Sequence, residues 1–198
     1  MKSKILTGFA ITVMVAFLSS CGKVPQAQID QANSAIDSAR AAQADVYLPA
    51  DFAALQDSMR AVNAYIEGQK SKLFKNYGPV KEDLTKVVTL ARTVSENAAV
   101  KKEEVKKEVE TLMTDIKNVI QENNKLFPRA PRGKEGAAVL EQMKTEMGTI
   151  DAAVTEAQGM YDQGKYMDAL NKIKAAKESA DNINNELKEA IKKVGGRI

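Results

Sequence analysis

The feature that most restricts the fold of this chain is a long amphipathic segment from Pro79 to about Asn124. No glycine and no further proline occurs in it, and apolar residues recur in steps of three and four positions. This spacing places them along one side of an α-helix. Without interruption the helix would be about 70 Å long, because each residue adds about 1.5 Å. A bend near Ser95 or Lys101 is the alternative. The apolar stripe consists of Val80, Leu84, Val87, Ala91, Val94, Ala98, Val105, Val109, Leu112, Ile116 and Val119.

The same spacing predicts four further helices, at about 26–46, 49–75, 137–163 and 165–194. Proline is tolerated in a first helical turn, which lets Pro49 begin the second of them. Turn-forming residues at 76–79, and a segment with two prolines and two glycines at 127–136, separate the helices. The apolar stripes of these four helices are expected to end at Val46, Leu73, Tyr161 and Val194.

Composition supports a helical fold. The chain has only five prolines and eleven glycines, while the helix-favouring residues alanine, lysine, glutamate and glutamine are plentiful. Helices with one apolar side bury it against one another. We therefore predict an all-α protein of antiparallel helical hairpins or a bundle, with a long central helix. Its expected divisions are an N-terminal helical region at 25–126, a loop at 127–136 and a C-terminal helical hairpin at 137–198.

The stretch MYDQGKYMDALNKIKAA, residues 160–176, joins the last two helices. Gly164 permits a tight turn there, and the alanines let two helices pack closely. In these positions the stretch resembles the second half of a tetratricopeptide repeat, which implies a helical hairpin. Glu156 departs from the repeat, because an apolar residue is usual at that position.

An earlier segment has a similar skeleton. Shifted by 86 positions, Gly78, Val80, Leu84 and Val87 align with Gly164, Tyr166, Leu170 and Ile173. The chain contains either two related helical hairpins or a coincidental match, since all amphipathic helices share the same spacing.

The N-terminus has the layout of a secretory signal peptide. Lys2 and Lys4 precede an apolar run from Ile5 to Leu18, and small residues follow. A membrane-spanning helix needs roughly 17–25 residues, so this run is short for a span. Residues 1–20 are therefore expected to be a leader that is removed from the mature protein.

The tetrapeptide Leu18-Ser19-Ser20-Cys21 resembles the lipobox of bacterial lipoproteins, and Cys21 is the only cysteine. The resemblance implies cleavage before Cys21, a diacylglycerol on its thiol and an acylated amine, with residues 21–24 as lipidated anchor and short linker. Two or more acyl chains hold a protein firmly at a bilayer, whereas one holds it only marginally. The alternative is an ordinary signal peptide with an unrelated cysteine beside it.

The lipobox resemblance implies a place in the bacterial cell envelope. Asp after the lipidated cysteine favours retention in the inner membrane of enteric bacteria, so Gly22 favours the outer membrane, facing the periplasm, over the cytoplasmic membrane. The region from Ser34 to Ala61 is similar to alanine-rich helical domains of uncharacterised envelope lipoproteins. In those domains an alanine-rich helix ends near a proline and a second helix folds back on it. That family implies a fold and no activity.

The residues that carry most enzyme and metal chemistry are scarce. The chain has no histidine, and lipid would block its one cysteine, so the commonest general base, metal ligand and thiol nucleophile are missing. The net charge is +3 for the whole chain and about +1 once Lys2 and Lys4 are removed, too little for a nucleic-acid partner. We predict no enzyme activity, no catalytic residue, no cofactor, no metal site and no nucleic-acid partner.

These observations predict a membrane-anchored envelope lipoprotein that acts as a non-enzymatic helical interaction or scaffold module. Lipidated Cys21 would attach it to the membrane, and an envelope protein or the cell wall would be its partner. One alternative is a periplasmic carrier or chaperone that binds apolar ligands or unfolded clients. The flexible side chains of Met59, Met143, Met147 and Met160 would then line a groove. The other alternative is a structural spacer. The oligomeric state stays open, because helix stripes are covered either within one chain or between copies.

Overall fold

The computed structural model describes residues 23–195, apart from the side chains at positions 134 and 135. Cys21 and the predicted leader lie outside the described residues. Within this range every regular element is a helix, which confirms the all-α prediction. In chain order the elements are α2 (Gln26–Ala41), α3 (Ala44–Tyr47), α4 (Pro49–Lys70), α5 (Gly78–Leu126), the 3-10 helix η1 (Phe127–Arg129), α6 (Lys134–Asp162) and α7 (Tyr166–Lys193).

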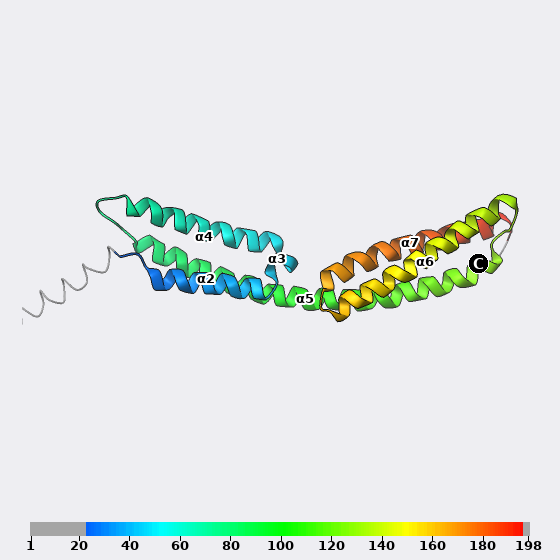
Figure 1. The fold of residues 1–198 in the computed structure, drawn as a ribbon, viewed down its shortest axis with the longest axis horizontal. Helices are drawn as coiled ribbons and strands as arrows, with labels where there is room; N and C mark the ends of the chain where they lie inside the picture. Colours follow the sequence, from blue (N-terminus) through cyan, green and yellow to red (C-terminus); the bar gives the residue numbers. More distant parts are fainter. Residues whose placement is uncertain (1–22, 196–198) are drawn as a thin grey trace, which may run out of the picture. The chain divides into compact units, whose positions relative to one another are not determined.

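The chain forms two compact units, and the 49-residue helix α5 contributes to both. Unit 1 extends to Lys101 and contains α2, α3, α4 and the first part of α5 (Figure 1). Unit 2 begins at Lys102 and contains the rest of α5 with η1, α6 and α7. The expected divisions separated the helices at 127–136, where α5 ends. The compact units instead divide inside α5, because the two parts of its apolar stripe pack against different helices.

Unit 1 is built from three helical segments whose apolar sides meet in one core. α4 returns antiparallel to α2, and the loop at 71–77 starts α5 back at the end where α2 begins (Figure 1). Ala32 and Ala39 of α2 are completely buried, and their small side chains let a neighbouring helix approach closely. The buried core consists of Ala32, Ile36, Ala39, Ala44, Phe52, Leu55, Met59, Val62, Ile66, Tyr77, Val80, Leu84, Val87, Ala91, Val94 and Ala98.

The first predicted helix, 26–46, is interrupted. Gln43 adopts a left-handed backbone with φ 60°, which ends α2 at Ala41 and starts the short helix α3 at Ala44. A left-handed residue does not continue a right-handed helix. The prediction was therefore wrong for Val46, which was expected on the buried stripe and is 43% exposed.

The second predicted helix, 49–75, ends early, at Lys70. The expected stripe is correct as far as Gln69, which is buried, and wrong for Leu73, which is 91% exposed. The N–H of Lys72 donates to the carbonyl oxygen of Gln69 at 3.1 Å, which closes a tight turn instead of continuing the α-helix. Leu73 consequently leaves the buried side of α4.

Unit 2 is a second three-helix arrangement. α6 and α7 form the predicted hairpin, and Gly164 in its turn has φ 75°, a conformation that glycine adopts without strain. α7 ends at Lys193, so Val194, expected on the buried stripe, is 63% exposed. The buried apolar residues of this unit are Val105, Val109, Met113, Ile116, Leu126, Ala130, Met143, Met147, Ile150, Ala157, Ala169, Leu170, Ile173, Ala176, Ala180, Ile183, Leu187 and Ile191.

A polar pair lies inside the core of unit 2. Asn123 of α5 is fully buried, and its side-chain amide donates to the carbonyl oxygen of Ala180 at 2.9 Å. Its side-chain oxygen accepts a hydrogen bond from the amide of Asn184 at 2.8 Å. Because buried amides need their partners, this pair favours one alignment of α5 with α7.

The sequence match between residues 78–87 and residues 164–173 compares the start of α5 in the α4–α5 hairpin with the start of α7 in the α6–α7 hairpin. Leu84 and its counterpart Leu170 are both buried. The two glycines differ, since Gly164 has a positive φ whereas Gly78 begins α5 and does not. The two hairpins therefore share a helical spacing but not a turn.

Candidate functional site

The loop between α4 and α5 exposes two large apolar side chains. Leu73 is 91% exposed and Phe74 is 87% exposed, more than any other exposed large apolar residue that the structure describes. Lys72 and Lys75 stand on either side of this pair and are exposed as well. Residues Lys72–Lys75 are named the KLFK tip below.

The base of this loop is held in place on both sides of the tip. Gln69 is buried, and its side-chain oxygen accepts a hydrogen bond from the backbone N–H of Asn76 at 3.2 Å. The side-chain oxygen of Asn76 accepts from the N–H of Gly78 at 3.0 Å, in the local turn that leads into α5. Tyr77 is only 2% exposed. The loop thus buries one aromatic side chain and presents another, Phe74, to the solvent.

The KLFK tip lies at the end of unit 1 where α2 begins. Gln28 in the first turn of α2 and Thr85 near the start of α5 line the same small cavity, so these helix starts are neighbours. The tip directly precedes α5 and therefore shares this end with the residues that lead into α2.

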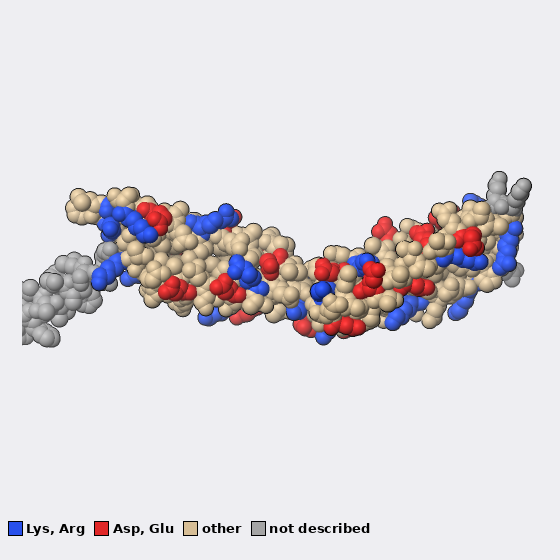
Figure 2. All heavy atoms as spheres, in the orientation of Figure 1, with Lys and Arg blue, Asp and Glu red and all other residues tan. Residues whose placement is uncertain are grey.

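Several lysines lie at the same end of unit 1 as the tip. Lys70, Lys72 and Lys75 lie close together in the chain, and Lys23 precedes α2 at the same end. Figure 2 shows lysine and arginine side chains gathered here beside an uncharged projection. Lys70 pairs with Glu67 at 2.6 Å, and this hydrogen bond raises the pKa of Lys70. Apolar groups flanked by cations form the combination that suits an anionic lipid surface.

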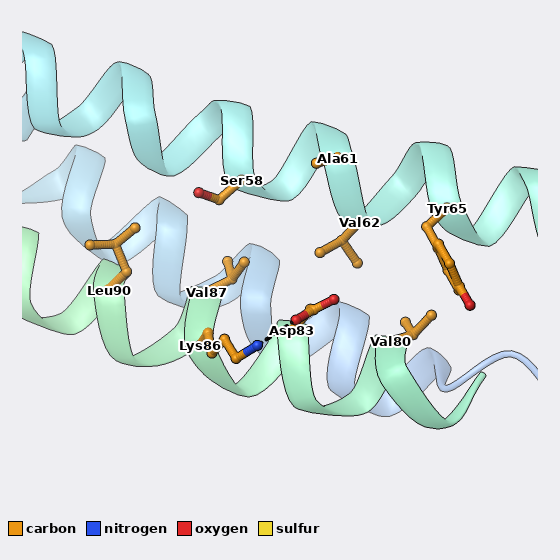
Figure 3. Close-up of a pocket in the computed structure, with 9 residues that line it drawn as sticks. All are labelled: Ser58, Ala61, Val62, Tyr65, Val80, Asp83, Lys86, Val87 and Leu90. Atoms are coloured by element: carbon orange, nitrogen blue, oxygen red, sulfur yellow. Dashed lines mark hydrogen bonds and ion pairs between the residues drawn. The ribbon is translucent and has the colours of Figure 1, made fainter.

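A second surface feature is a groove of about 410 Å³ between α4 and α5. In Figure 3, Val62 and Tyr65 reach from α4 toward Val80 and Val87 of α5. The residues that complete its lining are Ser58, Ala61, Asp83, Lys86 and Leu90. Its lining is mostly apolar, so it suits an apolar group better than a charged one.

The only charged residues in the lining of the groove pair with each other. The ammonium group of Lys86 lies 2.8 Å from the carboxylate of Asp83. The hydrogen bond to Asp83 raises the pKa of Lys86, which favours its charged form. The groove therefore offers a binding surface without an evident reactive group.

The four methionines singled out in the sequence are divided between the two units. Met59 is buried in unit 1, while Met143 and Met147 are buried in unit 2. None of the four lines the α4–α5 groove. The signal that sequence reasoning missed is the position of Tyr65 and Leu90, large apolar residues next to the buried stripes of α4 and α5.

The charged part of α5 after Lys101 contacts α6 and α7 within unit 2. The carboxylate of Glu108 lies 2.6 Å from the ammonium group of Lys174. The hydroxyl of Tyr161 donates to the carboxylate of Glu110, and this bond raises the pKa of Tyr161 to about 12. Glu122 pairs with Lys188 at 2.9 Å, and this hydrogen bond lowers the pKa of Glu122. These contacts link α5 to α6 and α7 at the surface of unit 2, outside its buried apolar core.

Three further observations bear on the predicted sites. Within residues 23–195 no group of three or more acidic, cysteine or histidine side chains is arranged to hold a metal ion. Among the described helices none is both long and apolar enough to cross a bilayer. Cys21, the one site residue predicted from the sequence, lies outside the described residues, so its lipidation stays a prediction.

Comparison with known proteins gives no match for this chain among family models, curated proteins or solved structures.

Proposed function

We propose that the chain is a lipid-anchored helical protein of a bacterial envelope that acts by binding a partner and not by catalysis. The observation that carries this proposal is the tetrapeptide Leu18-Ser19-Ser20-Cys21, which follows an apolar leader and directly precedes the helical body. Cys21 stands five residues before α2 begins at Gln26. A linker of that length spans at most about 18 Å. The anchor would therefore keep unit 1 close to the bilayer.

A partner of this body would be an envelope protein or the cell wall. Two helical units without histidine, carrying an apolar groove and an exposed tip, offer contact surfaces more readily than reaction chemistry. The lysine and the aspartate in the groove neutralise each other, which leaves its apolar lining as the main source of binding energy.

The anchor is tested by growing cells that express the full-length protein with an alkyne-labelled fatty acid. The protein should become labelled and stay in the membrane fraction, and Cys21→Ser should abolish both. Ser20→Ala is the matched control, because it changes the same tetrapeptide but keeps the thiol. A native protein with a free Cys21 thiol or a retained leader would contradict the anchor.

The binding role is tested by photo-crosslinking in intact cells. A crosslinking side chain at Tyr65 in the groove should capture one envelope partner reproducibly, and mass spectrometry should identify the same partner each time. The control position is Val139, an exposed residue of α6 in unit 2. The same set of abundant lipoproteins from both positions would argue against a specific partner.

A second function, carriage of an apolar ligand, is favoured by the volume of the α4–α5 groove. Its value of about 410 Å³ falls within the roughly 300–1,000 Å³ of small-molecule sites. Ala61→Phe would fill the groove from its exposed edge and should weaken binding of a fluorescent fatty acid by about tenfold or more. Val139→Phe should leave binding unchanged. Absence of binding to the unaltered protein would exclude this function.

A further inference from the structure

We propose that the KLFK tip inserts into the bilayer surface beside the lipid anchor, so that unit 1 contacts the membrane at two points. The proposed occupant of this surface is the headgroup and upper acyl region of a bilayer that contains anionic lipid. The inference rests on the proposed anchor for the orientation of unit 1. Insertion of the tip is a separate property, and it has a separate test.

Packing among the described residues leaves the side chains of Leu73 and Phe74 uncovered. The same loop buries Tyr77 to 2% exposure, while Leu73 and Phe74 are left 91% and 87% exposed. Leaving Leu73 and Phe74 in water forfeits the free energy that their burial would provide. Hydrogen bonds of Gln69 and Asn76 make the turn, and they do not involve the side chains of the tip.

The positive charges of Lys72 and Lys75, beside the apolar pair Leu73 and Phe74, favour an anionic lipid surface as the binding partner of the tip. Protein segments that lie in the membrane interface combine leucine or phenylalanine with lysine or arginine. Lys72 and Lys75 have long apolar stems, which let their ammonium groups stay among the headgroups while Leu73 and Phe74 go deeper. Each lysine near an anionic surface strengthens binding by about fivefold.

The position of the tip in unit 1 agrees with the same occupant. Gln28 and Thr85 line one cavity, so α2 and α5 start side by side, and the tip directly precedes α5. The linker from Cys21 to Gln26 spans at most about 18 Å, so an anchored lipid would hold this end of unit 1 near the bilayer. Insertion then becomes an intramolecular step with a high effective lipid concentration.

The composition of the chain makes the test direct, because it contains one cysteine and no tryptophan. The body from Cys21 onward contains every residue of both described cores. In a Phe74→Trp variant of this body, Cys21 is coupled to a maleimide lipid in vesicles of phosphatidylethanolamine and phosphatidylglycerol. Tryptophan emission should shift to shorter wavelength and be quenched by brominated acyl chains. High salt should weaken both effects, because it screens the lysines.

The matched control is Val46→Trp, an exposed apolar position in α3 at the opposite end of unit 1. Its emission should not change with the vesicles. Unchanged emission of the tryptophan at position 74 on tethered anionic vesicles would overturn the proposal. A shift that grows with protein concentration in the absence of vesicles would assign the tip to self-association, and would overturn it as well.

A second measurement uses the body without a tether, carrying Cys21→Ser. Replacing both Leu73 and Phe74 by alanine should reduce its partition onto the same anionic vesicles by about tenfold or more, since two large apolar side chains are lost. The paired variant Val46→Ala with Val100→Ala removes apolar groups that are exposed elsewhere and should leave partition unchanged. Equal losses in both pairs would contradict a specific role of the tip.

The outcomes for the tip and for the anchor are distinguishable. Maleimide coupling supplies the tether, so the result does not depend on whether cells attach lipid to Cys21. Insertion in vesicles without fatty-acid labelling in cells would remove the proposed anchor and support the tip. Labelling in cells without insertion in vesicles would overturn the tip and support the anchor.

Discussion

Replacing Asn123 by alanine should destabilise unit 2 by about 1–3 kcal/mol. Asn123 is completely buried where α5, α6 and α7 meet. Its amide donates to the carbonyl oxygen of Ala180 at 2.9 Å and lies 3.7 Å from the sulfur of Met147. Its oxygen accepts from Asn184 at 2.8 Å. A single side chain thus contacts both helices of the α6–α7 hairpin.

Two costs add in this variant. The buried amide of Asn184 loses its hydrogen bond to Asn123, and a buried polar group left without any partner costs about 1–3 kcal/mol. The space left by the missing amide adds about 1 kcal/mol, because the surrounding helices collapse only in part. Asn184 also hydrogen-bonds to the carboxylate of Glu122, which limits the first cost.

Urea unfolding measures this loss in unit 2 when the reporter is a tryptophan introduced at Val139. This position on α6 is 48% exposed and lies in a chain that has no other tryptophan. Asn185→Ala on the exposed side of α7 is the matched control and should change the free energy of unfolding by less than about 0.5 kcal/mol.

A paired variant tests the physical reason. Leucine at both Asn123 and Asn184 removes both partners together, so no buried amide is left unpaired, and it should cost less than Asn123→Ala alone. If Asn123→Ala costs less than about 0.5 kcal/mol, the reasoning is refuted. It is refuted equally if the losses from Asn123→Ala and Asn184→Ala simply add in the double alanine variant, because residues that interact do not behave additively.

Three further predictions concern local geometry and pH. Gly164→Ala should destabilise unit 2 by about 1 kcal/mol in the same urea assay, because the added carbon meets no neighbour but the φ of 75° disfavours a side chain. Gln43→Gly should stabilise unit 1 by about 1 kcal/mol in thermal unfolding followed by circular dichroism, since its φ of 60° suits glycine. In an ultraviolet titration one tyrosine, Tyr161, should ionise at about 12, and Glu110→Gln should move that pKa toward 10.0. Because the folded pKa is raised, the stabilisation from this hydrogen bond is complete below pH 10 and is lost as the pH rises through about 12.

The sequence was sufficient to predict the helical class and most of the helices, because the spacing of apolar residues reports which side of a helix is buried. The stripe of α5 from Val80 to Ile116 was largely correct, and so was the turn at Gly164. Helix ends were less predictable. The helix α2 ends near Gln43, which has no glycine or proline beside it. The sequence therefore contains no residue that predicts the left-handed backbone at this position. Leu73 follows Gln69 by four positions, the spacing of a continued stripe, although α4 has already ended.

The candidate site was predictable only in part, because a surface groove depends on which helices lie next to one another in the folded chain. The interval from Pro79 to Asn124 predicts one helix and does not reveal that different helices cover its two parts. The α4–α5 groove arises where Tyr65 and Leu90 lie beside two buried stripes. Neither residue has a distinctive neighbour in the sequence, so the groove became visible only when the two helices were placed together.

Residues at the stripe positions of these helices are expected to be apolar and buried, and Asn123 and Leu73 each depart from this expectation. Comparing them distinguishes a contact that stabilises the fold from a surface available for binding. Asn123 is polar at a stripe position and buried, yet its amide and its oxygen both have partners within unit 2. Leu73 is apolar at a stripe position and exposed, and Phe74 beside it is exposed as well. Departures from the local sequence pattern are expected at residues whose role is functional and not only to pack the core. The polar atoms of Asn123 are satisfied inside unit 2, whereas the described residues of unit 1 leave the apolar side chains of the KLFK tip uncovered. The lysines beside it and the short linker to Cys21 make a bilayer the surface to test first.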